Sequence, residues 1–173
     1  MTPTPTSGNR YPGPKMTDDL KIFFRPNGQD DWHYICDSWK KSFKESLNFH
    51  SPNYFPEITA YINRLVNLPT TQLTMAVDPD DPDFIFGYMC HDAQSIHYIF
   101  TRQCFRRADV AKRLVTEHLD TNQPIIATSW TRACEHINRQ YNGAIRYEPR
   151  QTWNTKKRKK RNGRLPTVTD NPA

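Results

Sequence analysis

The sequence predicts an α+β fold, in which a mixed, mostly antiparallel sheet is flanked by helices on both faces. Apolar residues recur at two-residue steps in some segments and at three- to four-residue steps in others, in the order β-α-α-β-β-β-α-β-α-β. The three strand-like segments within 72–102 leave no room for helices between them, which predicts an antiparallel meander. Each later strand-like segment follows a helix-like one, so helices are available to cover the sheet. A single domain over 18–153 accounts for the pattern.

The first part of the chain predicts one strand and two helices. Residues 20–25 form a strand-like run, which the Pro-Asn-Gly turn at 26–28 ends. A helix with an aromatic buried face follows, with Asp30 or Asp31 as its cap, and a second helix is expected over 53–67. The buried face of the first helix is expected to consist of Trp32, Ile35, Cys36, Trp39 and Phe43.

The second part of the chain predicts five strands and two helices. The prolines and aspartates of 78–83 favour a turn between the first two strands. The strands are expected over 72–77, 84–91, 96–101, 124–129 and 144–147, and the helices over 110–119 and 131–141.

Residues 94–119 carry the strongest functional signal. A strand-like run ends in a short basic turn, 102–107, and an amphipathic helix begins directly after it. Backbone N–H groups at a helix start and the positive end of the helix dipole favour an anion, and arginine adds charged donors. This strand, turn and helix therefore predict a phosphate-binding site.

The stretch Arg106-Arg107-Ala108-Asp109-Val110-Ala111 resembles the cofactor motif of the GCN5-related N-acetyltransferases (GNAT), written Gln/Arg-x-x-Gly-x-Gly/Ala. The resemblance extends over about 20–148, because the predicted element order is the one this family uses. It implies a GNAT-like acyltransferase domain that binds acetyl-CoA. By position in that motif, the pantetheine arm would lie along Phe100, Thr101 and Arg102, and the phosphates would lie around Arg106, Arg107, Ala108, Val110 and Ala111.

Asp109 stands where the motif has its middle glycine. Glycine lets the backbone approach a ligand closely and accepts unusual dihedral angles, whereas aspartate restricts both. A like charge a few ångströms from the phosphates would cost about 1–4 kcal/mol, or about ten- to thousandfold in affinity. Aspartate is also a favoured helix N-cap. The sequence leaves both interpretations open: a weakened cofactor site, or a capped helix start that needs no ligand.

The chain also resembles small acetyltransferase-like proteins of tailed bacteriophages. The shared strings are Asp31-Trp32, Ser38-Trp39, the acidic turn 78–83 before Ile85-Phe86-Gly87, and His97-Tyr98 followed by Phe105-Arg106-Arg107. This resemblance implies a location in the host cytoplasm or in association with a virion, with a phage or host protein as a partner.

Candidate catalytic groups are few. The family's reaction needs a base for the acceptor amine and often uses a tyrosine acid on the last helix. His97 is the candidate base, with His91 on the strand before it as an alternative. Tyr141 is the candidate acid, although Arg139 stands where that tyrosine would be expected. The alternatives are a polar residue on the solvent side of a half-buried strand for His97, and core packing for Tyr141. Glu135 and His136 are expected to face solvent.

The charge of the chain lies mostly in its last residues. Of the 24 basic residues, seven lie within 156–164, and residues 1–153 carry equal numbers of basic and acidic residues. The composition of 1–17 and 154–173 predicts disordered arms. The basic arm fits nucleic-acid phosphates, a solvated end or a nuclear import signal. The candidate nucleic-acid contacts are Lys156, Lys157, Arg158, Lys159, Lys160 and Arg161.

The cysteines and the apolar segments predict a cytoplasmic protein. Four widely spaced cysteines favour thiols over a disulfide framework. A zinc site from Cys90, His91, His97 and Cys104 lacks any paired ligand spacing, so no metal is expected. No signal peptide or membrane-spanning run is expected either.

Two functions remain open from the sequence. The first is an acyl-CoA-dependent N-acyltransferase whose amine acceptor is a protein, a small molecule or a nucleobase. The second is a catalytically inactive binding protein on the same scaffold. An open cleft between 96–102 and 124–128 would favour the enzyme, and a cleft filled by Phe105 or Trp130 would favour the binding protein.

Overall fold

A computed structural model describes residues 20–46 and 54–148. The predicted arms at 1–17 and 154–173, and with them the candidate nucleic-acid contacts at 156–161, lie outside these residues. The elements are β1 (Phe23–Pro26), α1 (Asp31–Ser46), α2 (Tyr54–Val66), β2 (Gln72–Val77), β3 (Ile85–His91), β4 (Ser95–Thr101), the 3₁₀ turn η1 (Gln103–Phe105), α3 (Val110–His118), β5 (Ile125–Ala127), α4 (Arg132–Gln140) and β6 (Ile145–Tyr147).

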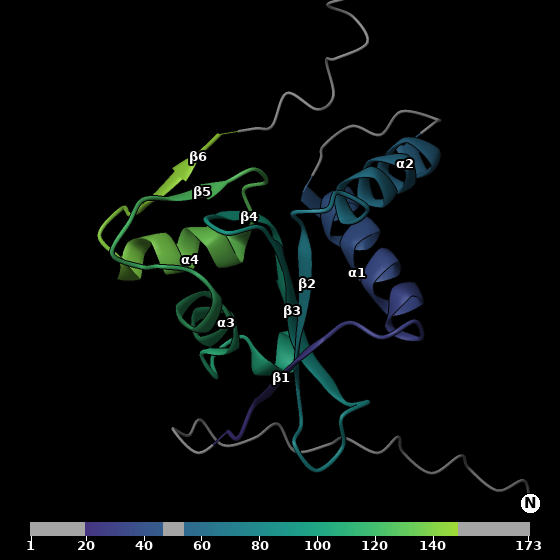
Figure 1. Ribbon diagram of the computed structural model, residues 1–173, viewed down its shortest axis with the longest axis horizontal. Coiled ribbons are helices and arrows are strands. Elements are labelled where there is room, and N and C mark those ends of the chain that lie inside the picture. Colours follow the sequence, from purple (N-terminus) through teal and green to yellow (C-terminus); the bar gives the residue numbers. More distant parts are fainter. Residues whose placement is uncertain (1–19, 47–53, 149–173) are drawn as a thin grey trace, which may run out of the picture.

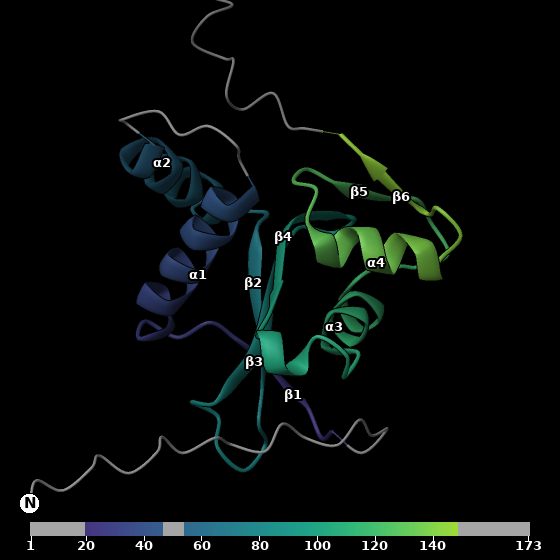
Figure 2. The same cartoon turned by 180° about the vertical axis from the view of Figure 1, so that it is seen from behind.

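The strands form one sheet in the order β1-β2-β3-β4-β5-β6. β1 to β4 pair antiparallel, whereas β4, β5 and β6 pair parallel. Helices α1 and α2 cover one face of the sheet, and α3 and α4 cover the other (Figures 1 and 2). The predicted α+β fold, with its meander and its helices on both faces, is therefore confirmed.

Two apolar cores lie on the two faces of the sheet. The core beneath α1 and α2 contains Trp39, whose ring stacks on Tyr98 with 4.3 Å between ring centroids. The core beneath α3 and α4 contains Ile96 and Ile99. Alternation along β4 would place Ile96 and Tyr98 on one face. They lie on opposite faces because β4 has a bulge: Tyr98 pairs with Cys90 and Ile96 with His91, which leaves His97 as the extra residue.

The first strand differs from the prediction in its position. It was expected over 20–25, but β1 begins at Phe23 and includes Pro26. Leu20 and Ile22 instead pack against the core under α3 and α4. Proline is tolerated because β1 is an edge strand that pairs only with β2, so one side of its backbone needs no ladder partner.

His91 and His118 predict a loss of stability in mild acid. Their rings lie 5.6 Å apart between centroids, and burial lowers the pKa of each below the usual 6.5. His91 also faces Thr74 and the Asp92 carbonyl, and Glu117 lies near His118. Because the unfolded chain binds these protons more readily, stability is present above pH 6.5 and is lost as the pH falls.

We therefore expect the free energy of unfolding to decrease from about pH 7 to about pH 5. The Asp31 carboxylate, whose pKa is lowered by its hydrogen bonds from Arg25, contributes only at more acidic pH. Urea unfolding at several pH values measures the effect, and His118→Phe should reduce it. An equal free energy of unfolding at both ends of this range would contradict the prediction that protonation of His91 and His118 destabilises the fold.

Candidate functional site

Strands β4 and β5 diverge soon after they begin to pair. Their register comprises Ser95 with Ile126 and Ile96 with Ala127, and the last hydrogen bond runs from the Thr128 N–H to the Ile96 carbonyl. Beyond this point the second half of β4 pairs with β3 alone. The sheet therefore opens between β4 and the segment that follows β5.

The open edge of β4 offers backbone hydrogen-bonding groups. The Arg102 N–H donates to the Phe86 carbonyl of β3 at 2.9 Å. Because backbone groups of alternate residues point to opposite sides of a strand, those of Phe100 face β3, and those of Ile99 and Thr101 face the opening. An extended ligand with amide groups could bond to this edge as a short extra strand.

A cavity of about 530 Å³ occupies the opening. Its floor is β4, and its walls are the start of α3, the start of α4 and two residues of α1. Trp130 lines it and is 41% exposed, whereas Phe105 is buried against Phe86 at 4.7 Å between ring centroids. Neither side chain fills the cleft. The lining residues are Ser42, Phe43, Tyr98, Ile99, Phe100, Thr101, Arg106, Arg107, Asp109, Ala111, Lys112, Trp130, Thr131, Arg132, Ala133, Glu135, His136 and Ile137.

Phe105 anchors the turn between β4 and α3 to the apolar core. Phe105 packs into the core, and the Ala108 N–H donates to its carbonyl at 3.1 Å. This anchoring leaves Arg106 and Arg107 exposed at the cavity. Asp109 precedes α3 with a φ of 53° and a ψ of 18°, in the left-handed region.

The conformation of Asp109 corrects one of the two sequence interpretations. Asp109 occupies the N-cap position, but its side chain makes no capping hydrogen bond, and an N-cap ordinarily has an extended backbone. The backbone instead adopts the left-handed conformation that glycine favours and other residues rarely take. The turn thus keeps the shape of a glycine turn although it carries a carboxylate.

The cavity has an excess of positive charge. Arg106, Arg107, Lys112 and Arg132 line it, and none of them takes part in a salt bridge with another residue that the structure describes. The carboxylates present are those of Asp109 and Glu135, and Glu135 is paired with Arg139 at 2.5 Å. Unpaired cations around a cleft that also has apolar walls favour an amphipathic ligand with an anionic end.

The predicted cofactor residues fall into two groups. Phe100, Thr101, Arg106, Arg107 and Ala111 line the cavity. The other three, Arg102, Ala108 and Val110, do not.

The side chains of these three residues make their contacts outside the cavity. Arg102 lies against the rings of Tyr34 and Phe84, and its Nε donates to the Tyr34 hydroxyl at 3.0 Å. Val110 is 1% exposed, and Ala108 packs against the same core. Only the backbone of Val110 and Ala108 is therefore available to a ligand. The cofactor roles of all eight residues stay predictions.

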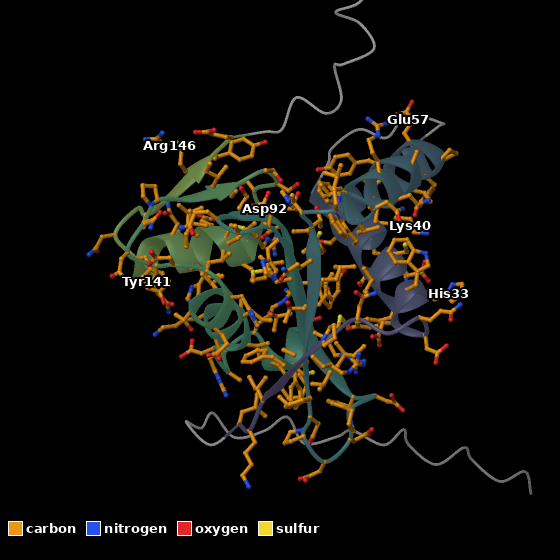
Figure 3. All side chains as sticks on the ribbon, viewed as in Figure 1. His33, Lys40, Glu57, Asp92, Tyr141 and Arg146 are labelled. Carbon is orange, nitrogen blue, oxygen red and sulfur yellow. The ribbon has the colours of Figure 1, made fainter. Side chains whose placement is uncertain are left out.

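The predicted catalytic residues lie away from the cavity. His97 is completely buried, with Nδ1 3.1 Å from Thr128 Oγ1 and Nε2 3.4 Å from Asp92 Oδ2. It therefore does not lie on the solvent side of the strand, because the bulge turns it inward. Tyr141 caps the C-terminal end of α4 and packs against the core, far along the helix from β4 (Figure 3). Neither residue lines the cleft, and their catalytic roles stay untested predictions.

Several cavity residues had not been predicted from the sequence. Lys112, Trp130, Arg132, Glu135 and His136 all line the cleft. On α4, Glu135 and His136 were expected to face solvent, and Arg132 lies on the same polar side, three and four residues before them. These side chains are exposed, as expected, but they face the cleft and not the open surface of the protein.

A second hollow, of about 640 Å³, lies beside α1. It shares Ser42, Phe100 and Arg106 with the first cavity, so the two meet beside the open half of β4. Its other lining residues are His33, Tyr34, Asp37, Ser38, Lys41 and Gln103. A ligand in the cleft could thus be reached from the α1 side of the sheet.

Two other features are absent from residues 20–46 and 54–148. No group of three or more histidine, cysteine, aspartate or glutamate side chains there could hold a metal ion. No helix in the same part of the chain has the length and apolar character needed to cross a membrane.

Comparison with known proteins gives matches at the level of structure alone. No protein-family model matches the chain, and no curated protein sequence matches it. Among solved structures, the apo form of YjaB from Escherichia coli matches with 21% identity and a TM-score of 0.44, over 57% of this chain and 65% of that one. The match thus spans just under two thirds of that protein's length.

Two further matches are acetyltransferases by description. A predicted acetyltransferase with acetyl-CoA from Clostridium acetobutylicum matches with 12% identity and a TM-score of 0.46, over 70% of this chain and 88% of that one. A ribosomal-protein-alanine N-acetyltransferase from Brucella melitensis matches with 10% identity and a TM-score of 0.41, over 88% of this chain and 99% of that one. At these values the matches establish neither the family nor the activity of this chain.

Proposed function

We propose that this chain binds an acyl-CoA in the cleft beside β4 and transfers the acyl group to an amine. The observation that carries the proposal is the divergence of β4 and β5 over a cavity with a cationic end. The resemblance of residues 106–111 to the acetyltransferase motif points to the same turn, independently of the cavity.

The parts of an acyl-CoA fit the parts of the cleft. The diphosphate fits the end with Arg106, Arg107 and Lys112, where α3 begins and its first N–H groups lack partners within the helix. The amides of the pantetheine arm fit the open backbone edge of Ile99 and Thr101. When bound, the cofactor would supply an acyl group activated as a thioester, and the chain's own residues would orient it toward the acceptor.

The acceptor would approach from the α1 side. The second hollow meets the cleft at Phe100, so an amine that enters there would come directly to the open half of β4. Asp37 and Lys41 also line this hollow. A protein amine, a small-molecule amine and a nucleobase amine all remain candidates.

Isothermal titration calorimetry of the full chain with acetyl-CoA at low salt tests the proposal. We expect binding in the micromolar to submillimolar range, with weakening as salt rises because the diphosphate contact is ionic. The control ligand is pantetheine, which lacks the phosphates and should bind more weakly. A folded protein that gives no heat up to millimolar acetyl-CoA would contradict the proposed function.

The variant Asp109→Gly is expected to bind acetyl-CoA about tenfold more tightly than the native chain. The substitution removes a negative charge beside the phosphates, worth about 1 kcal/mol or more at a partly exposed site. Glycine also accepts the φ of 53° without the steric cost of a side chain, so the fold should not be weakened. Asp109→Asn serves as a control because it removes the charge and keeps the side chain. An unchanged affinity in both variants would show that Asp109 does not face the ligand.

A second candidate function rests on the same residue. The carboxylate of Asp109 at the cationic end fits a scaffold that has lost its cofactor and acts as a phage- or host-protein-binding factor, with the basic arm in contact with nucleic acid. Deletion of 154–173 would then flatten the salt dependence of nucleic-acid binding. An unchanged salt dependence would show that residues 154–173 do not contact nucleic acid.

A further inference from the structure

The α4 helix presents a polar face to the cleft. Its first two turns contribute Arg132, Glu135 and His136 to the lining, beside the apolar Ala133 and Ile137. These residues belong to α4, whereas β4 forms the floor of the cavity and the cations Arg106 and Arg107 belong to the turn before α3. The inference that follows rests on the proposed function, because it concerns the reacting end of a bound acyl-CoA.

Amide formation from a thioester removes a proton from the amine nitrogen and delivers one to the leaving thiolate, and a single group can do both. Two carboxylates line the cavity, but Glu135 is bound to Arg139 and Asp109 lies at the phosphate end. His97 is completely buried outside the lining, and Tyr141 lies at the far end of α4. His136 is the one imidazole among the described residues that line this cavity, and imidazole suits transfer in both directions.

The hydrogen bonding of the His136 ring leaves one nitrogen for the reaction. Nε2 lies 3.2 Å from the side-chain amide nitrogen of Gln140, one turn further along α4. No hydrogen bond to Nδ1 from another residue within the described part of the chain is present. Rotation of the Gln140 amide can present either its N–H or its carbonyl oxygen to Nε2, so Gln140 can hold the ring in both protonation states.

We propose that His136 is the catalytic acid–base residue of this cleft. The acceptor nitrogen attacks the thioester carbonyl carbon, a C–N bond forms, and the C–S bond breaks with its electron pair on sulfur. His136 takes the proton that the amine loses and returns it to the thiolate sulfur. The products are an amide and a free thiol, and His136 ends in its starting state. The chemical class of substrate is thus an amine that attacks in its neutral form, with the proton of its ammonium form already released to solvent.

Several charged groups surround His136. Arg132, Glu135 and Arg139 share α4 with it, and across the cavity lie Arg106, Arg107, Asp109 and Lys112. The surplus of cations also favours a thiolate without any contribution from His136. A test must therefore separate the effect of the imidazole from that of the general positive field.

The experiment measures the pKa of the thiol of CoA while it is bound to the full chain, from the ultraviolet absorbance of the thiolate. We compare the native chain with His136→Gln, which keeps a hydrogen-bonding side chain, and with Lys21→Gln, which removes an exposed cation that lines neither cavity. Calorimetry with CoA gives the affinity of each chain in parallel, and circular dichroism confirms that each is folded.

The native chain and Lys21→Gln should bind CoA with a thiol pKa about one unit lower than that in His136→Gln, because a protonated imidazole beside the sulfur stabilises the thiolate. The affinities of the three chains should agree within about threefold, since the phosphate end holds the ligand. An equal thiol pKa in the native chain and in His136→Gln would overturn the role of His136 and leave the proposed function intact. Absence of CoA binding in the native chain would overturn the proposed function itself, and this inference with it.

Discussion

Replacement of Gly87 by alanine is expected to destabilise the protein by more than about 3 kcal/mol, a large fraction of the stability of a domain of this size. A Cβ at this position would lie 2.4 Å from the Phe100 carbonyl oxygen, 3.2 Å from Thr101 Cα and 3.3 Å from Val110 Cγ1. The first two atoms belong to the backbone of β4, so they cannot rotate away. The extra carbon would push β4 from β3 and disturb the strand that forms the floor of the cleft.

Gly28→Ala provides the matched control for this prediction. A Cβ at Gly28 would meet its nearest neighbour, Asp31 Oδ2, at 3.6 Å, which is ordinary van der Waals contact. We expect this variant to unfold within about 1 kcal/mol of the native protein. Urea unfolding of the two variants side by side measures the difference. Equal midpoints would refute the claim that close contact of β3 and β4 at Gly87 holds the sheet.

The double variant Arg106→Ala with Arg107→Ala is expected to bind acetyl-CoA at least a hundredfold more weakly than the native chain. A hydrogen bond to a charged group contributes about 1.5–3 kcal/mol, so the loss of two such donors predicts at least this factor. Both side chains are exposed at the cavity and unpaired within the described residues, so their removal should leave the fold intact.

The control for this variant removes two cations elsewhere. Lys21 and Arg146 are exposed and line neither cavity, and Arg146 lies on β6 (Figure 3). Their joint replacement by alanine lowers the net charge by the same amount and should change the affinity by less than about threefold, because distant surface charges are screened by salt. Equal losses in the two double variants would mean that net charge, and not the turn before α3, attracts the ligand.

Much of the fold could be predicted because most elements follow one regular period. The apolar faces of α1 and α4 recur at helical spacing, and the loops carry turn residues, so the order of elements emerged correctly. The prediction was less accurate at β1, where Leu20 and Ile22 continue the apolar run and yet pack outside the ladder. Periodicity detects apolar residues, and it does not distinguish a strand from an extended segment that contacts the core.

The side chains of the site were harder to predict, for two physical reasons. The bulge at His97 breaks the alternation of β4, so the alternative interpretation of His97 as a solvent-facing residue was wrong. On α4, the sequence separates buried from exposed residues, but it cannot tell which exposed residue overlooks a cleft. His136 and Arg132 therefore resembled ordinary surface residues until the divergence of β4 and β5 placed them beside a cavity.

Nuclear magnetic resonance of the isotope-labelled full chain, titrated with CoA, tests whether CoA binds in the cleft beside β4, because it reports where the ligand lies as well as whether it binds. We expect the backbone amide signals that shift first to belong to Ile99 and Thr101 on β4, to 110–112 at the start of α3, and to 131–136 at the start of α4. Signals from α2, on the other side of the sheet, should stay in place. Shifts confined to other surfaces, or a folded chain whose signals do not move at millimolar CoA, would contradict the binding of CoA in this cleft.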